Sequence, residues 1–323
     1  MGIKTIGVLT SGGDAPGMNA CIRAVVRTAL SKGIKVKGIM RGYHGLIVDD
    51  IFDIDNRRFV SEIINRGGTI LHTARCLEMT TPEGVAKAAE AVRNAAIDCL
   101  VVIGGDGSYR GALELSKLGV NVLCIPGTID LDVASSDYTI GFDTAITTAM
   151  DAINKLRDTS TSHDRVSAVE VMGRRAGYIA LWAGIAGGAD IILTPEKPED
   201  YNIEEITNTV LKNKEIGKSH SLIVVAEGVG NVEEIAREIQ TNTGIEARGT
   251  ILGHLQRGGY PTALDRVHAS MMGGIAVEIA NEERFSRAIC YKNGRYIDID
   301  LEEAINMQKT IDKTMYDISK MLV

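Results

Sequence analysis

Short, largely apolar runs that end in glycine-rich turns and lead into amphipathic segments recur along this 323-residue chain. Three such runs are Thr5–Thr10, Leu100–Ile103 and Asn121–Ile125, and none has a regularly alternating polar face. Strands that are apolar on both faces are typical of a parallel sheet covered by helices on both sides. The pattern therefore predicts an α/β fold in which ligands bind beyond the carboxyl ends of the strands, where the glycine-rich turns fall.

The rest of the chain continues the same alternation. We expect helices over residues 18–31, about 109–118 and 145–158. Further strands are expected at Val166–Val171, Ile191–Leu193, Leu222–Ala226 and Thr250–Leu252. The chain is too long for one small core and no low-complexity linker divides it, so a second lobe would be built from crossovers of the same chain.

Composition and charge narrow the classes of partner. A net charge of -7 and a pI near 5.5 argue against nucleic acid or an anionic membrane as a partner held by bulk electrostatics. No run reaches 18 consecutive apolar residues and no secretory signal is visible, so we expect a cytoplasmic protein without a membrane span. The cysteines have no C-x-x-C spacing, which favours buried, unreactive thiols over disulfides or a thiolate metal site. They are Cys21, Cys76, Cys99, Cys124 and Cys290.

The first glycine-rich turn is the string SGGDAPGMN at Ser11–Asn19. Adjacent glycines let a backbone approach a phosphate or a ribose and present its N–H groups to it. The short string S-G-G alone would be an ordinary strand-to-helix turn. Its extension through D-A-P-G-M-N favours a ligand-binding turn.

The second turn is GGDGS at residues 104–108, directly after an expected strand. Its three glycines predict a close cradle for a phosphate, Asp106 is placed to reach a Mg²⁺ ion, and Ser108 is placed to cap the helix or contact phosphate. The chain lacks G-x-x-x-x-G-K-[ST], so this is not the turn of a P-loop NTPase. G-G-D-G occurs in several kinase classes and favours a nucleotide site, with a structural turn as the alternative.

The third turn is PGTIDLD at residues 126–132. In an extended segment, residues two apart point the same way, so Asp130 and Asp132 are expected to share a face. Two nearby carboxylates can divide the work of phosphoryl transfer: one accepts a hydroxyl proton while the other holds metal or orients the base. A solvated acidic turn is the alternative for D-x-D alone.

An acidic protein that binds phosphates must concentrate its positive charge locally, and guanidinium groups suit phosphate best. Most arginines are simply exposed surface residues, but His254 and Arg257 are fixed between glycines in the string GHLQRGG at residues 253–259. No H-E-x-x-H motif occurs, so a zinc site is not expected. Further arginines near expected element ends are Arg157, Arg165, Arg174, Arg175 and Arg248.

Nine separated strings occur in one order along the chain: TSGGDAPGMNA, INRGGT, VIGGDGS, PGTID-D, TIGFDTA, RDTSTSH, VEVMGR, GHLQRGG and DR. Together they resemble the bacterial ATP-dependent 6-phosphofructokinases, from residue 4 to about residue 300. The resemblance implies a two-lobed α/β fold, each lobe a mostly parallel sheet flanked by helices, and a homotetramer. It also implies Mg²⁺-dependent transfer of the γ-phosphate of ATP to O1 of fructose 6-phosphate, a step of glycolysis. The implied lobes are 1–140 with 255–305 for ATP, and 141–254 with 306–323 for the sugar phosphate.

The resemblance also assigns roles residue by residue. Asp130 resembles the general base and Arg174 the transition-state arginine, with Thr128 and Asp132 on the same loop. The implied ATP site comprises Gly13, Arg75, Cys76, Gly104, Gly105, Asp106, Gly107 and Ser108, with Asp106 on Mg²⁺. The implied sugar-phosphate site comprises Thr128, Ile129, Asp130, Met172, Gly173, Arg174, Glu227, His254, Leu255, Gln256 and Arg257, together with Arg165 and Arg248 from a neighbouring subunit. The implied site for ADP or phosphoenolpyruvate as effectors comprises Arg23, Arg27, Arg57, Arg157, Gly188, Asp190, Lys218 and His220.

Two small residues bear on the phosphoryl donor. Gly107 and Gly127 match the ATP-using branch of the family, whereas pyrophosphate-using relatives place Asp and Lys there. A longer side chain at these positions would fill the region of the α-phosphate. The resemblance therefore implies ATP as the donor.

Three positions depart from the family. Leu131 stands where the family has Asn, whose side chain can hydrogen-bond the loop. If that hydrogen bond is buried, its loss costs roughly 1–3 kcal/mol. We therefore expect a lower kcat or a lower affinity for the sugar. Asp190 replaces a glutamate of some well-regulated relatives, and Ile216 stands where a lysine is common. These two changes predict weak or altered allosteric control.

Two rival interpretations remain. A lipid or NAD kinase would explain the G-G-D-G turn but not the strings at 172–174 and 253–259 or the paired aspartates. A non-catalytic regulator that binds nucleotide and sugar phosphate is favoured only by Leu131, and the retention of Asp106, Asp130 and Arg174 argues against it.

Overall fold

A computed structural model describes residues 2–322 of the chain. The chain divides into two compact units. The first runs to Thr144 and includes Arg257–Lys309, and the second comprises Ala145–Gln256 and the segment from Thr310 onward. These boundaries lie two to four residues beyond those implied by the resemblance.

The first unit is built on a seven-stranded sheet with the strand order β11-β10-β5-β4-β1-β2-β3. Its strands are β1 (Thr5–Ser11), β2 (Lys35–Ile39), β3 (Ile51–Asp53), β4 (Cys99–Gly104), β5 (Val122–Pro126), β10 (Arg287–Lys292) and β11 (Arg295–Asp300). Neighbouring strands are parallel except for the outer pairs, β2 with β3 and β10 with β11. Strands β1, β4 and β5 are buried along their whole length, as a central parallel sheet requires.

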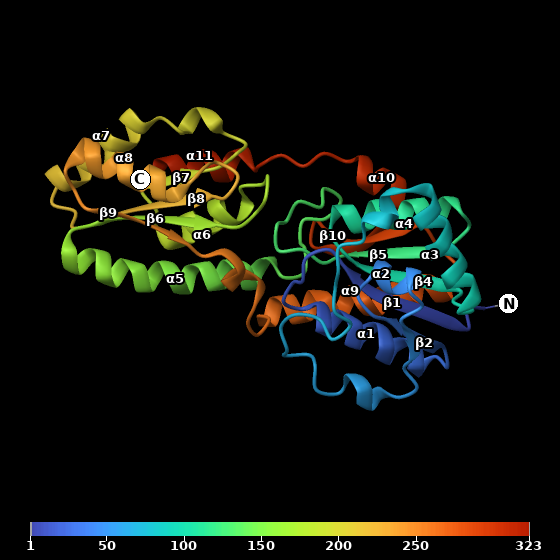
Figure 1. Ribbon diagram of the computed structural model, residues 1–323. Helices are drawn as coiled ribbons and strands as arrows, with labels where there is room; N and C mark the ends of the chain where they lie inside the picture. The colour runs from blue at the N-terminus through green and yellow to red at the C-terminus, as the bar shows by residue number, and fades with distance from the viewer. Residues whose placement is uncertain (1, 323) are drawn as a thin grey trace. The chain divides into compact units, whose positions relative to one another are not determined.

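Helices cover both faces of this sheet (Figure 1). On one face lie α1 (Met18–Ser31) and α9 (Ala263–Asn281), which pack against each other. On the other lie α2 (Tyr43–Ile47), α3 (Pro82–Asn94), α4 (Asp106–Lys117) and α10 (Leu301–Asn306). The core on this second face joins strand residues such as Leu100 and Val102 to helix residues such as Val92 and Leu115. Two short 3-10 turns complete the unit, η1 (Arg57–Val60) and η2 (Leu77–Thr80).

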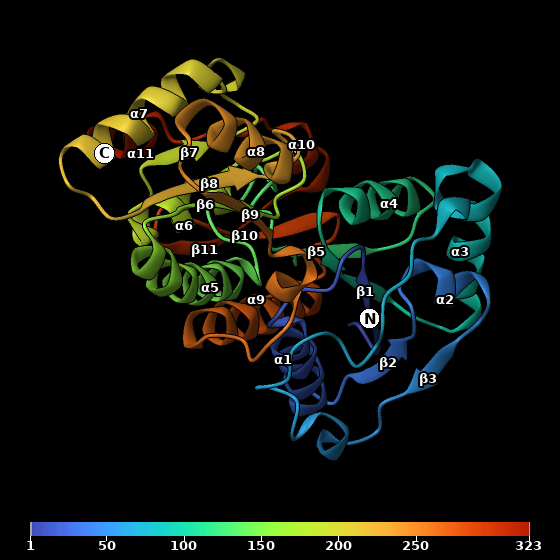
Figure 2. The ribbon, with the colours of Figure 1, turned by 60° about the vertical axis from the view of Figure 1, so that its left-hand side comes forward.

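The second unit has a fully parallel four-stranded sheet, ordered β7-β8-β6-β9. Its strands are β6 (Val166–Val171), β7 (Ile191–Leu193), β8 (Ser221–Ala226) and β9 (Ala247–Ile251). Figure 2 shows α7 (Ile203–Glu215) and α8 (Val232–Thr243) on one face, and α5 (Phe142–His163) and α6 (Tyr178–Gly187) on the other. Helix α11 (Lys313–Met321) packs on α6, and the 3-10 turns are η3 (Pro198–Asp200) and η4 (Gly253–Arg257).

The predicted α/β fold with two lobes of mostly parallel sheet is confirmed, with local corrections. Helix α4 begins at Asp106, three residues before the expected start at Tyr109, because Gly105 is its N-cap in an extended conformation. Strand β9 lies at Ala247–Ile251 and not at Thr250–Leu252. The apolar-run pattern does not reveal β2, β3, β10 or β11, because strands near a sheet edge carry charged residues, as in Arg295–Asp300.

The cysteines bear out the prediction of inert thiols in four of five cases. Cys21, Cys99, Cys124 and Cys290 are buried and free, and burial raises the pKa of each thiol. Cys76 is only partly buried. Within residues 2–322, no helix combines the length and the apolar character that crossing a bilayer would need.

Candidate active site

The three glycine-rich turns meet at one edge of the first unit's sheet. Ser11 at the end of β1 pairs with Gly104 at the end of β4, and Gly104 pairs in turn with Pro126 at the end of β5. The turns therefore leave three adjacent parallel strands side by side at their carboxyl ends. This is the edge where ligands bind in sheets of this kind.

Two of these glycines lie where a side chain would be crowded. A Cβ atom on Gly104 would lie 2.4 Å from Ser108 Oγ and 2.5 Å from the carbonyl oxygen of Ser11. A Cβ atom on Gly127 would lie 3.0 Å from Ile103 Cγ2 and 3.1 Å from Met18 Cε, and its N–H donates to the carbonyl of Gly104 at 3.0 Å. Gly107, in the first turn of α4, faces open space instead. The turn thus combines a rigid base with an open helix N-terminus, a geometry that suits an anionic ligand.

Arg257 lies on the first turn. Its Nη1 donates to the carbonyl of Asp14 at 3.1 Å, and a Cβ atom on Gly13 would lie 2.5 Å from that nitrogen. Thr73 Oγ1 donates to the carbonyl of Gly12 at 2.6 Å, which ties the segment that carries Arg75 to the same turn. The structure therefore brings the predicted nucleotide residues of this turn together with Arg257, which the resemblance assigned to the sugar phosphate.

Two carboxylates line one cavity at this edge. Asp106 and Asp132 border a space of about 220 Å³ together with Tyr109, Arg110 and residues of α10. Asp106 also forms an i,i+4 ion pair with Arg110 at 2.9 Å. Hard carboxylate oxygens of this kind are the donors that Mg²⁺ prefers, and Mg²⁺ needs only one or two of them from the protein. The residues present therefore fit a divalent cation.

Leu131, between the two loop aspartates, corrects the expectation that they share the face of an extended segment. Its φ is +55°, in the left-handed region, so the alternation of an extended chain does not pass through it. Leu131 is buried, with 4% of its surface exposed, and Asp130 is buried to 2%. The N–H of Asp130 donates to Thr128 Oγ1 at 3.1 Å. The orientation of the two carboxylates is therefore set by a kinked loop.

Ser108 also differs from one expectation, because its side chain does not cap α4. It is buried beneath the turn, next to Gly104 and Gly12. It fills the space that Gly12 and Gly104 leave.

Two of the nine strings shared with the family, TIGFDTA and DR, have a structural role. Asp265, of the string DR, is buried and accepts hydrogen bonds from Tyr138 Oη at 2.5 Å and from the N–H of Gly141 at 2.6 Å. Its other oxygen accepts from the N–H of Thr144 at 2.9 Å and from its hydroxyl at 2.5 Å. Burial raises the pKa of Asp265, and these four donors oppose the rise. The strings TIGFDTA and DR thus hold the start of α5 on α9.

In the second unit, side chains from other segments hold the backbone of a loop at the carboxyl end of β6. Glu227 Oε1 accepts from the N–H groups of Gly173 at 3.1 Å and Arg174 at 2.5 Å. Gln256 is fully buried, and its Oε1 accepts from the N–H of Met172 at 3.3 Å. Arg174 has a φ of +55°, in the left-handed region, as Leu131 does in the first unit. The side chain of Arg174 therefore projects from a kinked loop, as those of Asp130 and Asp132 do. The residues expected at the sugar site, Met172, Gly173, Arg174, Glu227 and Gln256, are brought together, with His254 and the exposed Leu255 in the neighbouring turn η4.

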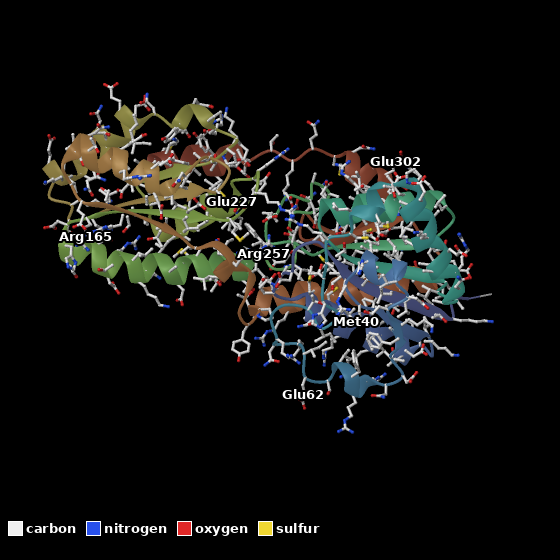
Figure 3. The ribbon with its side chains drawn as sticks, viewed as in Figure 1. Met40, Glu62, Arg165, Glu227, Arg257 and Glu302 are labelled. Carbon is white, nitrogen blue, oxygen red and sulfur yellow. The ribbon has the colours of Figure 1, made fainter. Side chains whose placement is uncertain are left out.

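Arg165 and Arg248 lie at the opposite end of this sheet. Figure 3 shows Arg165 and Glu227 at opposite ends of the second unit, and the six residues of β6 span roughly 20 Å. Glu246 bridges the two arginines: its Oε2 is 2.6 Å from Arg165 Nε and its Oε1 is 2.6 Å from Arg248 Nη2. These guanidinium groups hold the pKa of the Glu246 carboxyl below its usual range. Sequence reasoning missed Glu246, although its place two residues before Arg248 was a signal.

The residues expected to bind effectors form one group in each unit. In the second unit, Asp190 is buried and accepts from the N–H of Leu222 at 2.8 Å and from Asn213 Nδ2 at 3.0 Å, and it pairs with Lys218. Arg157 donates to the carbonyl of Gly187 beside Gly188, and burial and the charge of Arg157 lower the pKa of His220. Ile216 is 72% exposed. In the first unit, Arg23 and Arg27 lie on α1, against which η1 with Arg57 packs.

Glycine-rich turns at the carboxyl edge of a parallel sheet, with carboxylates and arginines and without a P-loop, are features of an α/β enzyme that acts on phosphorylated ligands. The sequence profile of the family described as Phosphofructokinase matches residues 5–280. The chain belongs to the phosphofructokinase family.

Individual relatives agree with this assignment. The chain is 58% identical to a protein named ATP-dependent 6-phosphofructokinase from Clostridium botulinum, over 320 residues that cover 99% of both chains. The solved phosphofructokinase of Saccharomyces cerevisiae is 32% identical with a TM-score of 0.86, and this chain covers 48% of that one. A pyrophosphate-dependent phosphofructokinase from Marinobacter aquaeolei has the same fold, with a TM-score of 0.85 at 24% identity over 96% of this chain and 86% of that one.

Proposed function

We propose that this protein transfers the γ-phosphate of ATP to O1 of fructose 6-phosphate, giving fructose 1,6-bisphosphate and ADP as a cytoplasmic step of glycolysis. The observation that carries the proposal is the 58% identity, over 99% of both chains, with a protein named ATP-dependent 6-phosphofructokinase. The arrangement of the three turns supports it, because they place the expected nucleotide residues on one sheet edge beside Asp130.

ATP binds on the turns of the first unit. The N–H groups of the first turn of α4 face the phosphates, and Gly104 and Gly127 allow the backbones of the turns to come together beneath them. The resident metal is Mg²⁺, which Asp106 and Asp132 would hold at the cavity they both line. When bound, it neutralises charge on the phosphates.

Asp130 is the general base. Phosphoryl transfer asks little covalent chemistry of the protein, so removing the proton from the sugar hydroxyl, positioning and charge neutralisation are the main contributions. Thr128 positions the base because its hydroxyl accepts from the N–H of Asp130 at 3.1 Å. Arg174 supplies a cation for the charge that develops on the transferred phosphoryl group.

Fructose 6-phosphate binds to the loop of the second unit that carries Met172, Gly173 and Arg174. Glu227 holds this loop through two backbone N–H groups, so it positions the loop as well as offering its carboxylate to sugar hydroxyls. Arg165 and Arg248, at the far end of the same sheet, serve the sugar phosphate of a neighbouring subunit. The protein is then a homotetramer whose active sites are shared between subunits, which sedimentation or light scattering will test.

ATP, and not pyrophosphate, is the donor. Gly107 faces open space, so an aspartate there would enter the region left free for the rest of the nucleotide. A Cβ atom on Gly127 would lie 3.0 Å from Ile103 and 3.1 Å from Met18, so a lysine there would require these side chains to move. Gly107 keeps room for the larger donor, and Gly127 fits closely against its neighbours.

ADP or phosphoenolpyruvate acts as an effector at the arginine groups around Arg23 and Arg157. Control is weak, because Lys218 is paired with the buried Asp190 and Ile216 supplies no cation. Titrating each effector against the initial rate tests this, and strong sigmoidal regulation by both would contradict it.

A coupled assay with ATP, Mg²⁺ and fructose 6-phosphate tests the proposed reaction. We expect fructose 1,6-bisphosphate with ATP and a far smaller rate with pyrophosphate. Product only from a lipid or NAD as acceptor would favour a kinase of another class, and binding of both ligands without product would favour a regulator.

A further inference from the structure

Lys309, which follows α10, reaches into the loop that carries Asp130 and Asp132. Its Nζ donates to the carbonyl of Leu131 and to the carbonyl of Ser136, both at 2.8 Å. These carbonyls are 178 and 173 residues away in sequence, and both belong to the first unit. The ammonium thus joins the two ends of the short segment 131–136.

One end of this segment is firmly anchored. Ser136 Oγ donates to the carbonyl of Tyr138 at 2.7 Å and accepts from the N–H of Tyr291 at 3.0 Å, and the N–H of Asp137 donates to the carbonyl of Tyr291 at 2.8 Å. Tyr291 belongs to β10, so this end is fixed to the sheet. Val133, in the middle of the segment, is part of the core.

The other end contains a costly conformation. Leu131 has a φ of +55°, a region that leucine enters reluctantly because its Cβ crowds the backbone, and that Asn and Gly tolerate far better. Such a residue persists only where its surroundings over-determine it. Here the carbonyl of Leu131 is bonded to Lys309, and its side chain is buried.

Burial and neighbouring charges set the protonation of Lys309. Burial lowers the pKa of the lysine to about 8, Asp137 and Asp132 oppose that shift, and Lys292 adds to it. A neutral amine retains two N–H groups, enough for the two hydrogen bonds to the carbonyls of Leu131 and Ser136.

We propose that Lys309 is a positioning residue for phosphoryl transfer: by tying the carbonyl of Leu131 to that of Ser136, it holds Leu131 in its left-handed conformation and so aims the Asp130 and Asp132 carboxylates. This role rests on the proposed function. The two hydrogen bonds of Lys309 to these carbonyls act through the backbone of the loop.

The test compares Lys309→Met, which keeps the aliphatic stem but has no donor, with Lys309→Arg, which keeps donors and charge. Each is combined with Leu131→Asn, since asparagine accepts the left-handed conformation without help. We expect Lys309→Met to lower kcat on the order of 30-fold, with KM for both substrates within about threefold. Lys309→Arg should retain most of the rate, and the double variant Lys309→Met/Leu131→Asn should regain at least tenfold over Lys309→Met.

A merely structural lysine would give a different result. Its loss would lower the melting temperature without a selective fall in kcat, and the effect of Lys309→Met would be the same with Leu or Asn at position 131. That outcome overturns the proposal. If Lys309→Met does not fold, Lys309→Gln, whose amide can still donate to one carbonyl, replaces it with the same expectations at smaller size.

Hydrogen exchange of the amides of residues 128–137 gives a readout that does not need activity. Exchange should be faster in Lys309→Met than in the wild type and should slow again in the double variant. Unchanged exchange would overturn the proposal even in an active enzyme. A wild type that produces no fructose 1,6-bisphosphate but shows the exchange pattern would refute the proposed function and leave the loop tie standing.

Discussion

The two units build their candidate sites at the carboxyl edges of parallel sheets in different ways. The first unit works through its backbone: turns of β1, β4 and β5 pack so closely that Gly104 has no room for a Cβ atom. The second unit relies on side-chain carboxylates: Glu227 accepts from the loop at the carboxyl end of β6, and Glu246 pairs with Arg165 and Arg248 at the opposite end of the sheet. Filling a closely packed glycine in the first unit should therefore lower stability, whereas removing an exposed cation of the second unit should leave stability nearly unchanged.

The largest effect is expected from Asp130→Asn. Loss of a general base costs about 10²–10⁴-fold in rate, so we expect kcat to fall on the order of a thousandfold with KM for ATP little changed. The amide has the same shape, so the melting temperature should stay close to that of the wild type. A fall of less than tenfold in the coupled assay would remove Asp130 from its proposed role.

Substitutions at two glycines three residues apart test how closely the turns of the first unit pack. Gly104→Ala should lower the free energy of unfolding by about 1–3 kcal/mol, because the added methyl overpacks against Ser108 and the carbonyl of Ser11. Gly107→Ala is the control, since its methyl enters open space, and it should change stability by less than about 0.5 kcal/mol. Equal losses in denaturant titrations would contradict the distinction.

A buried cation gives the first unit a pH-dependent stability. Burial lowers the pKa of Lys309 to about 8, so between that value and the ordinary lysine pKa of 10.5 the unfolded chain binds more protons. The wild type should therefore gain stability as pH rises through this window, and should gain nothing from Lys309 below it. Relative to Lys309→Met we expect a gain of about 1–3 kcal/mol between pH 8 and 10.5. Parallel stability curves for the two proteins would contradict it.

The smallest effect on stability is expected from Arg248→Ala in the second unit. The side chain is 70% exposed, and its pair with Glu246 contributes about 0–1 kcal/mol, so unfolding should hardly change. A hydrogen bond to a charged phosphate contributes about 1.5–3 kcal/mol, so KM for fructose 6-phosphate should rise at least about tenfold at constant kcat. A loss of stability as large as that of Gly104→Ala would erase the difference between the units.

Local patterns predicted much of the first unit's site. The apolar runs at β1, β4 and β5 are buried on both faces and so stand out, and the turns that follow them contain the expected residues. Charged edge strands such as Arg295–Asp300 were not visible, because partial exposure removes the apolar signal. The expected extended segment through Asp130 and Asp132 was wrong, because Leu131 has a φ of +55°, so the rule of alternation does not apply to this pair.

The sequence by itself determined the family, the order of the turns and the glycines within them, since each of these is written in a contiguous string. Only the tertiary structure decided which glycines are closely packed, that Glu246 lies between two arginines, and that Lys309 bonds to Leu131 from 178 residues away. Spacing along a chain fixes local conformation, whereas contacts between distant residues depend on how the sheet brings its turns together.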